Sequence, residues 1–378
     1  MGRHARSTAR RRFSSLTGPL VAAVSLLAAC TTPPSGSAAC STAWSQVALP
    51  TGITPSSVTA SGSVVAVGGS APAGEAREPR LVSIDGATTT EIPLAAKSSY
   101  GRLAQLVFLA TDGVGIAAVG TATGGAHLNP RWTVWRGTTD LLVEEPQPME
   151  TFGGWDAGSL SGLTLDAVGP LLVGSWSTGS GTIAGALWTT SGATWARDPR
   201  GSALAGSAAD PALPTGIATR GSQALVSGFV SDPANGVLHA TLWVGDRSNG
   251  WHAVALPGAA TDSVATAVAC EGESCWVAGR VGSILTLWQV TEATAVQVPD
   301  VPQMPVAPAS QTPRLAVSQD LLWVGIDGSD QRAAIMRDGA WAVTESPGRD
   351  ITAVATTGDR VFAVVDDADS RLLVSCLG

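Results

Sequence analysis

Short apolar runs alternate with clusters of glycine and polar residues along most of the chain, and the pattern repeats. Each unit has a short apolar strand, a tight glycine turn, a second apolar strand usually ending in glycine, a variable loop, a third strand often carrying Trp, and a fourth strand. Seven second strands occur, at residues 64–68, 116–120, 171–174, 225–228, 276–279, 322–325 and 361–364. The glycines that end the first six lie 52, 54, 54, 51 and 46 residues apart. This period is typical of repeat architectures such as propellers.

Glycine also precedes most of these second strands, because tight hairpins need a positive φ that glycine adopts without strain. The turns are expected at Gly62, Gly113, Gly169, Gly221, Gly272 and Gly358. With four strands per unit and hardly any helical periodicity, the pattern predicts an all-β protein, a seven-bladed β-propeller of four-stranded blades.

The two ends of the repeat region complement each other. After residues 371–376 the seventh unit lacks a fourth strand, whereas residues 43–50 precede the first unit and read like the fourth strands elsewhere. We therefore expect the N-terminal strand to complete the last blade, which removes both open sheet edges.

Tryptophan recurs at one position of the unit, the third or fourth strand. Such residues could form a sugar-stacking surface, but their regular recurrence favours filling of the wedge between neighbouring blades. Trp155 and Trp176 fall outside this register, in expected loops, and are better candidates for ligand contact.

The N-terminal segment indicates export. Arginines at positions 3, 6, 10, 11 and 12 precede an apolar run over residues 20–29, which is too short to span a bilayer and is typical of a secretory signal. Leu27, Ala28, Ala29 and Cys30 resemble the bacterial lipobox, which implies cleavage after residue 29 and acylation of Cys30. We expect a signal peptide over residues 1–29, a linker over 30–39 and the propeller over 40–378, held at the outer face of the cell membrane. An ordinary cleaved signal is the alternative, and the route, general secretory or twin-arginine, stays open.

The net charge of the chain limits the classes of binding partner. Five of the 22 basic residues and none of the 30 acidic ones lie in residues 1–29, which leaves a net charge of −13 after cleavage. Such a surface repels nucleic acid and anionic headgroups, so we expect no nucleic-acid partner and attachment through the lipid alone.

Four cysteines remain once Cys30 is acylated, and export favours disulfides. Cys270 and Cys275 flank a hairpin turn and are expected to face each other across two antiparallel strands. Cys40 and Cys376 become neighbours only if the ring closes as above. A cysteine metal site lacks the paired spacing that zinc sites use.

The units resemble the BNR or sialidase-type propeller repeat, and more broadly WD40/YVTN-like propellers, with degenerate Asp-box turns. Residues 188–195 keep the Gly-x-Thr-Trp half of that motif, but Thr190 replaces its Asp. The motif is structural in that family, so the resemblance implies a fold more than an activity.

A sialidase-like site would need a Tyr nucleophile with a Glu partner, an arginine cluster and an Asp acid. Tyr100 is the only tyrosine, Arg102 follows it, and Arg131 lies in a loop expected on the same face. Glu144 and Glu145 are the nearest carboxylates, but adjacent strand residues point to opposite faces. We interpret these arginines as solvated loop residues.

Metal chemistry has little support. The three histidines of the mature chain, His127, His239 and His252, are not at ligand spacing. The acidic loops at 327–330 and 366–369 could hold Ca²⁺, although such loops are more often solvated. We expect no cofactor, with calcium as the one alternative.

The expected function is a non-catalytic surface lipoprotein that binds a protein or envelope glycan through its loops. The candidate binding face comprises Tyr100, Arg102, His127, Arg131, Trp155 and Trp176. The alternative is a sialidase-like glycoside hydrolase acting on extracellular glycans.

Overall fold

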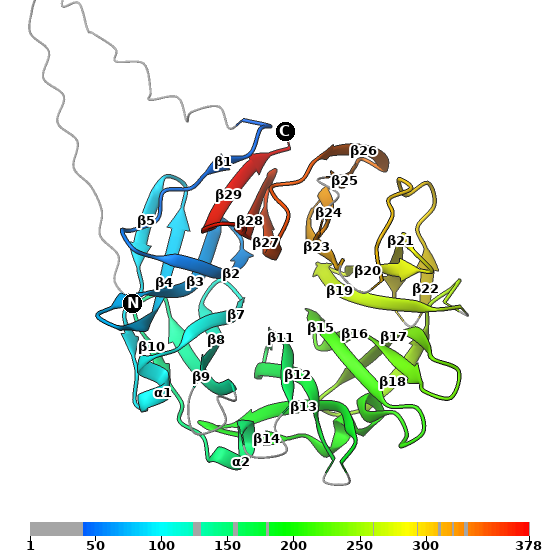
Figure 1. Ribbon diagram of the computed structural model, residues 1–378, viewed down its shortest axis with the longest axis horizontal. Helices are drawn as coiled ribbons and strands as arrows, with labels where there is room; N and C mark the ends of the chain where they lie inside the picture. Colours follow the sequence, from blue (N-terminus) through cyan, green and yellow to red (C-terminus); the bar gives the residue numbers. More distant parts are fainter. Residues whose placement is uncertain are drawn as a thin grey trace, which may run out of the picture. The chain divides into compact units, whose positions relative to one another are not determined.

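The computed structural model describes residues 41–377 except 124–129, 154–157, 179–180, 260, 293, 309–310, 320 and 329–331. The chain divides into two compact units, Met1–Ala39 and Cys40–Gly378. The first unit, with Cys30, lies outside the described residues. The second consists of seven sheets arranged around a central axis (Figure 1). The predicted seven-bladed β-propeller is confirmed.

Each blade is an antiparallel sheet whose strands follow one another from the axis outward. Blade 1 contains β2 (Thr54–Ser61), β3 (Val64–Ala73), β4 (Ala76–Asp85) and β5 (Thr88–Glu91). Blade 2 contains β7 (Gln105–Thr111), β8 (Gly115–Thr123), β9 (Pro130–Thr138) and β10 (Leu142–Glu144), and β6 (Leu94–Ala95) adds a parallel strand at its outer edge. Blade 3 contains β11 (Ser159–Asp166), β12 (Gly169–Ser177), β13 (Ile183–Ser191) and β14 (Thr194–Arg197).

The remaining blades repeat this order. Blade 4 contains β15 (Ala212–Arg220), β16 (Gln223–Asp232), β17 (Val237–Asp246) and β18 (Gly250–Ala255). Blade 5 contains β19 (Ser263–Glu271), β20 (Ser274–Val281), β21 (Ile284–Thr291) and β22 (Thr294–Gln297). Blade 6 contains β23 (Pro313–Ser318), β24 (Leu321–Ile326), β25 (Arg332–Arg337) and β26 (Ala340–Glu345). Short helices lie between blades: α1 (Ser99–Arg102), α2 (Met149–Phe152) and the 3₁₀ helix η1 (Pro199–Ala205).

Blade 7 joins the two ends of the described chain. It contains β27 (Ile351–Thr357), β28 (Arg360–Asp366), β29 (Ser370–Cys376) and, as its outermost strand, β1 (Ser45–Gln46). Ser45 pairs with Val374 and Gln46 with Leu373. The N-terminal strand therefore completes the last blade as predicted, although it is shorter than the apolar pattern of residues 43–50 indicated.

The ring has two distinct faces. The innermost strands all begin at one central cavity and end at another, so they run in the same direction along the axis. We call the face with the turns between first and second and between third and fourth strands the turn face. The opposite face, with the second-to-third-strand loops and the connections between blades, is the loop face. All six predicted turn glycines have positive φ, from 56° at Gly221 to 148° at Gly169.

Large side chains fill the space between blades. The largest fully buried ones include Trp135, Trp188, Trp243 and Trp288, which lie on the third strands of blades 2 to 5. Because each sits at one position of its blade, these residues pack the wedge between neighbouring sheets. The packing interpretation of the recurrent tryptophans is confirmed.

Candidate functional site

The first strands of six blades carry a β-bulge near the loop face. Their pairing with the second strand shifts register at equivalent positions, for example between Pro55 and Ser57 and between Pro214 and Gly216. A bulge leaves one residue unpaired and re-aims its side chain. The bulged residues all line one cavity: Ser56, Val107, Ser161, Thr215, Thr266 and Thr352.

That cavity, on the axis at the loop face, has a volume of about 800 Å³ and takes residues from every blade. Its lining combines hydroxyl side chains with apolar ones such as Phe108, Leu213 and Phe229. Neither histidine nor tryptophan is among the described residues that line it. We call it the loop-face cavity.

Most of the hydroxyl groups on the bulged residues donate hydrogen bonds that join neighbouring blades. Ser56 Oγ donates to the Leu106 carbonyl (2.6 Å), and Thr215 Oγ1 donates to that of Ala265 (2.8 Å). Thr266 Oγ1 donates to the carbonyl of Pro313 (3.0 Å). Each bond joins the innermost strands of consecutive blades. These hydroxyls therefore have no proton left to donate to a ligand, although their oxygens still have acceptor capacity.

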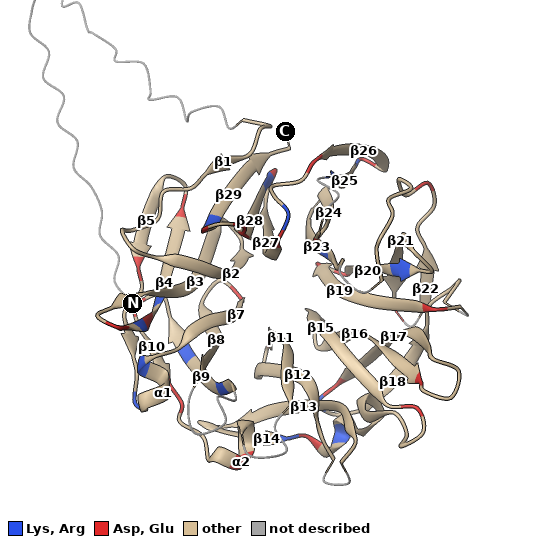
Figure 2. Cartoon of the chain, in the orientation of Figure 1, with Lys and Arg blue, Asp and Glu red and all other residues tan. Residues whose placement is uncertain are grey.

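The innermost strands carry almost no charge away from their turn ends (Figure 2), and Arg314 on β23 is the exception. Its Nε donates to the Ile351 carbonyl (3.0 Å), and its Nη2 lies 3.9 Å from Asp327 Oδ2. Burial lowers the pKa of Arg314, which Asp327 opposes, and burial raises the pKa of Asp327. The terminal nitrogens of Arg314 make no hydrogen bond to any described residue, so they are available to an anion.

The other charged groups at this cavity have closer hydrogen-bond partners. Arg280 is 4% exposed and donates from Nη1 to Asp262 Oδ2 (2.6 Å) and to the Gly282 carbonyl (2.7 Å). Asp366 accepts from the Ser370 hydroxyl. Among the described residues, Arg314 is therefore the cation at this cavity with the most unused donor capacity.

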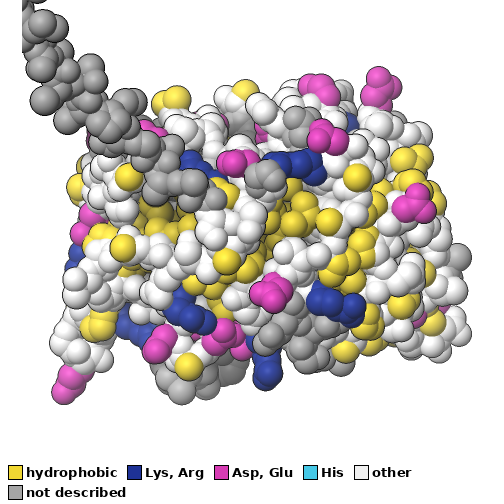
Figure 3. Space-filling view, turned by 90° about the horizontal axis from the view of Figure 1, so that it is seen from above, with side chains coloured by type: hydrophobic (Ala, Val, Ile, Leu, Met, Phe, Trp, Pro, Cys, Tyr) yellow, Lys and Arg dark blue, Asp and Glu magenta, His cyan; other side chains and the backbone are white. Residues whose placement is uncertain are grey.

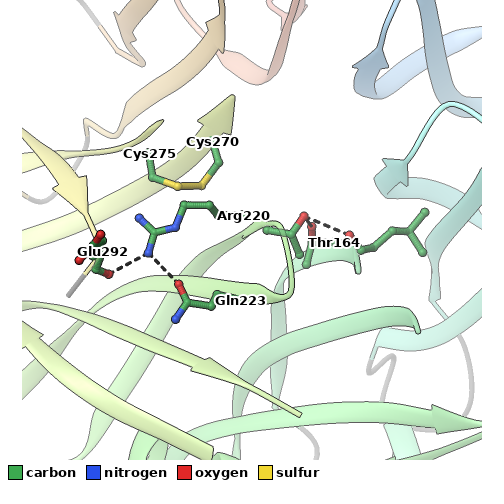
Figure 4. Close-up of a disulfide and its surroundings, with 8 residues drawn as sticks. Thr164, Arg220, Gln223, Cys270, Cys275 and Glu292 are labelled. Atoms are coloured by element: carbon green, nitrogen blue, oxygen red, sulfur yellow. Dashed lines mark hydrogen bonds between the residues drawn. A yellow bond between two sulfur atoms is a disulfide. The ribbon is translucent and has the colours of Figure 1, made fainter. Parts of the chain in front are cut away.

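At the turn face, the cavity of about 540 Å³ is lined by residues from the ends of the innermost strands, including Cys270. Cys270 and Cys275 form a disulfide across the β19–β20 hairpin, as predicted. Arg220 lies beside it and donates to Gln223 Oε1 and to the Glu292 carbonyl, both at 2.8 Å (Figure 4).

The second predicted disulfide is described at one end only. Cys376 is disulfide-bonded, and Cys40 lies outside the described residues. Close by, the Cys376 amide donates to the Ser41 carbonyl (2.8 Å), and Ser375 Oγ donates to that of Thr42 (2.8 Å). The pairing of Cys40 with Cys376 stays a prediction.

Tyr100, Arg102 and Arg131 lie away from the axis, and none of them lines the loop-face cavity. Tyr100 and Arg102 are on α1. The expectation that Arg131 is a solvated loop residue is wrong, because it is a half-buried residue of β9 whose guanidinium carbon lies 5.9 Å from the Tyr100 ring centre. Glu144 is occupied elsewhere, accepting from the amides of Lys97 (2.6 Å) and Ser98 (2.7 Å). Tyr100 thus has no hydrogen-bonded Glu partner in the part of the chain that the structure describes, and the constellation required by the sialidase-like alternative is not seen there.

Of the three remaining predicted binding residues, one is buried in the core and two are outside the described part of the chain. The expectation that Trp176 lies in a loop is wrong. It is on β12, 4% exposed, and its ring packs edge-to-face on Trp188 with centroids 5.2 Å apart. The strand continues to Ser177, past Gly174, where the sequence pattern predicts its end. His127 and Trp155 lie outside the described residues.

Sequence reasoning missed Arg314. The available signal was a single charge inside an innermost strand, but the strand order was needed to give it meaning. No group of three potential metal-binding side chains occurs among the described residues. Ser329 and Asp330 of the first acidic loop lie outside them, so calcium stays a hypothesis. None of the described helices is long and apolar enough to cross a bilayer.

Comparisons with known proteins concern the fold. No family model matches the chain, and no match is found among curated proteins. Among solved structures, the chain is similar to the β-propeller domain of the Trilobed protease from Pyrococcus furiosus (10% identity, TM-score 0.51, 86% of this chain and 95% of that one). That domain is described as having an open velcro topology, whereas here β1 pairs with β29.

Two whole peptidases are similar at the same level. They are a Mycobacterium tuberculosis puromycin-hydrolyzing peptidase (12% identity, TM-score 0.53, 89% of this chain and 55% of that one) and Pyrococcus horikoshii acylaminoacyl peptidase (10%, 0.52, 86% and 52%). The chain spans about half the length of each. The BNR or sialidase-type assignment is not confirmed by these neighbours. At such identities the likeness concerns architecture alone, and the chain is a seven-bladed β-propeller whose structural neighbours include peptidase propeller domains.

Proposed function

We propose that this chain is a non-catalytic, lipid-anchored surface protein that binds an acidic segment of a protein partner in the loop-face cavity. The observation that carries the proposal is Arg314, a cation with unused donors at the wall of a cavity of about 800 Å³. Charge-assisted hydrogen bonds from an arginine to a carboxylate are among the stronger polar contacts in proteins.

Other features of the cavity favour binding over catalysis. A hydroxyl nucleophile needs a neighbouring base, but the bulge hydroxyls of Ser56, Thr215 and Thr266 donate to backbone carbonyls. No described histidine lines the cavity. Rigid strands around a hollow carry binding residues well, because little order has to be imposed when a ligand binds.

A peptide suits the lining better than a glycan. Sugar recognition would be favoured by exposed aromatic faces, yet Trp176 is buried and no described tryptophan lines the cavity. Phe108 and Phe229 with neighbouring hydroxyls offer the mixture of apolar and acceptor groups that a peptide uses. Anchoring through Cys30 rests on the lipobox resemblance, and the mass of the N-terminal peptide from membranes tests it.

Binding can be tested with a chain of residues 31–378 and two pools of ten-residue peptides. One pool carries Asp and Glu, and the other carries Asn and Gln at the same positions. Affinity selection followed by mass spectrometry should enrich acidic peptides. Arg314→Gln should weaken their binding by roughly 10- to 100-fold, because a hydrogen bond to a charged group contributes about 1.5–3 kcal/mol.

The matched control is Arg77→Gln, which removes the same charge from an exposed loop-face residue outside the cavity. It should leave the enrichment unchanged. Equal enrichment of both pools by the unmodified chain, or equal loss in the two variants, would contradict the proposed site.

A further inference from the structure

The turn face carries the two most exposed large hydrophobic side chains of the described chain. Val114 is 76% exposed and Val168 is 74% exposed. They lie at the tips of equivalent turns, between the first and second strands of blades 2 and 3, which are neighbours in the ring (Figure 1). Leu141, 42% exposed, lies on the same face in the β9–β10 turn. Single exposed apolar side chains are ordinary, and many are visible in a side view of the surface (Figure 3). The loop face has some as well, among them Met149 and Ile183. The three on the turn face differ in lying at the tips of tight turns of neighbouring blades.

Both valine turns are built in the same way. Asp112 Oδ1 accepts from the amides of Val114 (2.9 Å) and Gly115 (2.7 Å). Asp166 Oδ1 likewise accepts from the amide of Val168 (2.8 Å) and that of the next residue (2.9 Å). These bonds fix the turn backbone, so both side chains are held outward.

The charges beside the two valines differ. The Asp166 side chain is 6% exposed and is bound by Arg247 Nε at 2.6 Å, so its charge is compensated. Asp112 is exposed, and hydrogen bonds from the amides of Val114 and Gly115 lower the pKa of its carboxyl. Asp140 is exposed on the same face. The tips therefore suit an uncharged lipid surface better than an anionic one.

The described chain also begins at the turn face. The Ser41 carbonyl accepts from Cys376, at the end of β29, and the next residue, Leu377, donates to the Asp359 carbonyl in the β27–β28 turn (2.9 Å). Thr357, before the same turn, donates to the Gly62 carbonyl in the corresponding turn of blade 1. Ser41, the first described residue after the segment with Cys30, therefore lies at this face.

The length of that segment favours one orientation. Nine residues separate Cys30 from Cys40, which reach about 30 Å when fully extended. A nine-residue strand such as β12 is itself about 30 Å long, and the loop face lies beyond it. A tether to the bilayer brings the turn face close, whereas contact through the loop face would need the whole tether stretched along the ring.

We propose that the turn face of blades 2 and 3 lies against an uncharged region of the bilayer, with Val114 and Val168 in the boundary between headgroups and acyl chains. This inference rests on the lipid anchor of the proposed function. The loop-face cavity then points away from the membrane. Full burial of each valine raises the affinity of the turn face for the bilayer by roughly tenfold. The two valines therefore set the orientation of the propeller, whereas the lipid on Cys30 attaches it to the membrane.

The test uses residues 31–378 with six histidines in place of Cys30, bound to phosphatidylcholine vesicles through a nickel-chelating lipid. One variant, Val168→Cys, carries an environment-sensitive fluorophore on the turn face. The matched variant, Ile183→Cys, carries it on the loop face of the same blade, at a residue that is 49% exposed. Emission at position 168 should shift to shorter wavelength and be quenched by spin-labelled lipid, and emission at 183 should not.

Equal quenching at the two positions, or stronger quenching at 183, overturns the proposal. With the fluorophore at 168, Val114→Asp should reduce quenching, while Val296→Asp, at a 52% exposed outer-strand residue, should not. An effect of equal size in both also overturns it. Because the histidine tether replaces the acyl chain, these outcomes do not depend on acylation. Absence of acylated Cys30 from cells would refute the anchor alone.

Discussion

Trp44 should control the closure of the ring. It is half-buried ahead of β1, and its ring packs edge-to-face on the buried Trp323 of blade 6 with centroids 6.2 Å apart. Its Nε1 donates to the Glu345 carbonyl (3.0 Å) at the end of β26. One side chain thus ties the N-terminal strand of blade 7 to the neighbouring blade.

The magnitude follows from these contacts. An aromatic pair contributes about 0.5–1.5 kcal/mol, a hydrogen bond about 0.5–1.5 kcal/mol, and burial of half an indole about 2 kcal/mol. Since the alanine methyl and local relaxation recover part of this, Trp44→Ala should lower the free energy of unfolding by about 3 kcal/mol. Trp44→Phe keeps the ring contact and loses the N–H, so it should cost about 1 kcal/mol.

Urea unfolding of residues 31–378 measures the difference. With an m value of about 3 kcal/mol per M, the midpoint should fall by about 1 M in Trp44→Ala. Hydrogen exchange locates the effect, because the Val47 amide donates to the Leu372 carbonyl across β29 (2.9 Å). Amides of β1 and β29 should exchange faster while those of β16 do not.

The predicted Cys40–Cys376 disulfide would hold the same strands, so the loss should be larger in reduced protein than in oxidised protein. An unchanged midpoint in both states would refute the argument that Trp44 closes the ring. Faster exchange in every blade alike would show general destabilisation instead of local opening.

Two further predictions concern buried carboxylates. Glu145 accepts from Arg136 Nη2 (2.5 Å) and, across the boundary of blades 2 and 3, from Trp195 Nε1 (3.1 Å). Glu145→Gln removes the charge that strengthens both bonds, so it should lower the urea midpoint by an amount equivalent to about 1–2 kcal/mol. The exposed Glu150→Gln should leave the midpoint unchanged. Hydrogen bonding to Arg200 lowers the pKa of Asp198, so its stabilisation is present above the unfolded-state pKa and is lost as pH falls through the lower folded-state value. Asp198→Asn should therefore lower the free energy of unfolding by about 0.5–1 kcal/mol at pH 7. Urea unfolding at about pH 3 should show a smaller difference between the variant and the unmodified protein. A difference that is the same at both pH values would contradict a stabilising ion pair.

The candidate site needed the fold before it could be recognised. The sequence predicts that Tyr100 and Arg131 share a face, because the connections between blades and the second-to-third-strand loops lie on the same side of a propeller. The two residues do lie together, with the guanidinium over the ring. However, the distance of these two residues from the axis depends on how α1 packs, and the pattern of strands in the sequence does not predict that packing. Trp176 was misplaced for a similar reason, since the alternation does not show where a strand ends after an internal glycine.

The amino-acid sequence by itself determined the number of blades, the closing strand, the turn glycines and the Cys270–Cys275 bridge. These follow from local periodicity and from the positive φ of tight hairpins. Only the tertiary structure decided that the bulges near Ser56 and Thr215 turn one residue of each strand toward the axis, and that Arg314 meets them there. The residues that line the loop-face cavity lie as far as 315 positions apart, from Pro55 to Ser370. Nothing in a local pattern encodes which side chains converge at the centre of a ring.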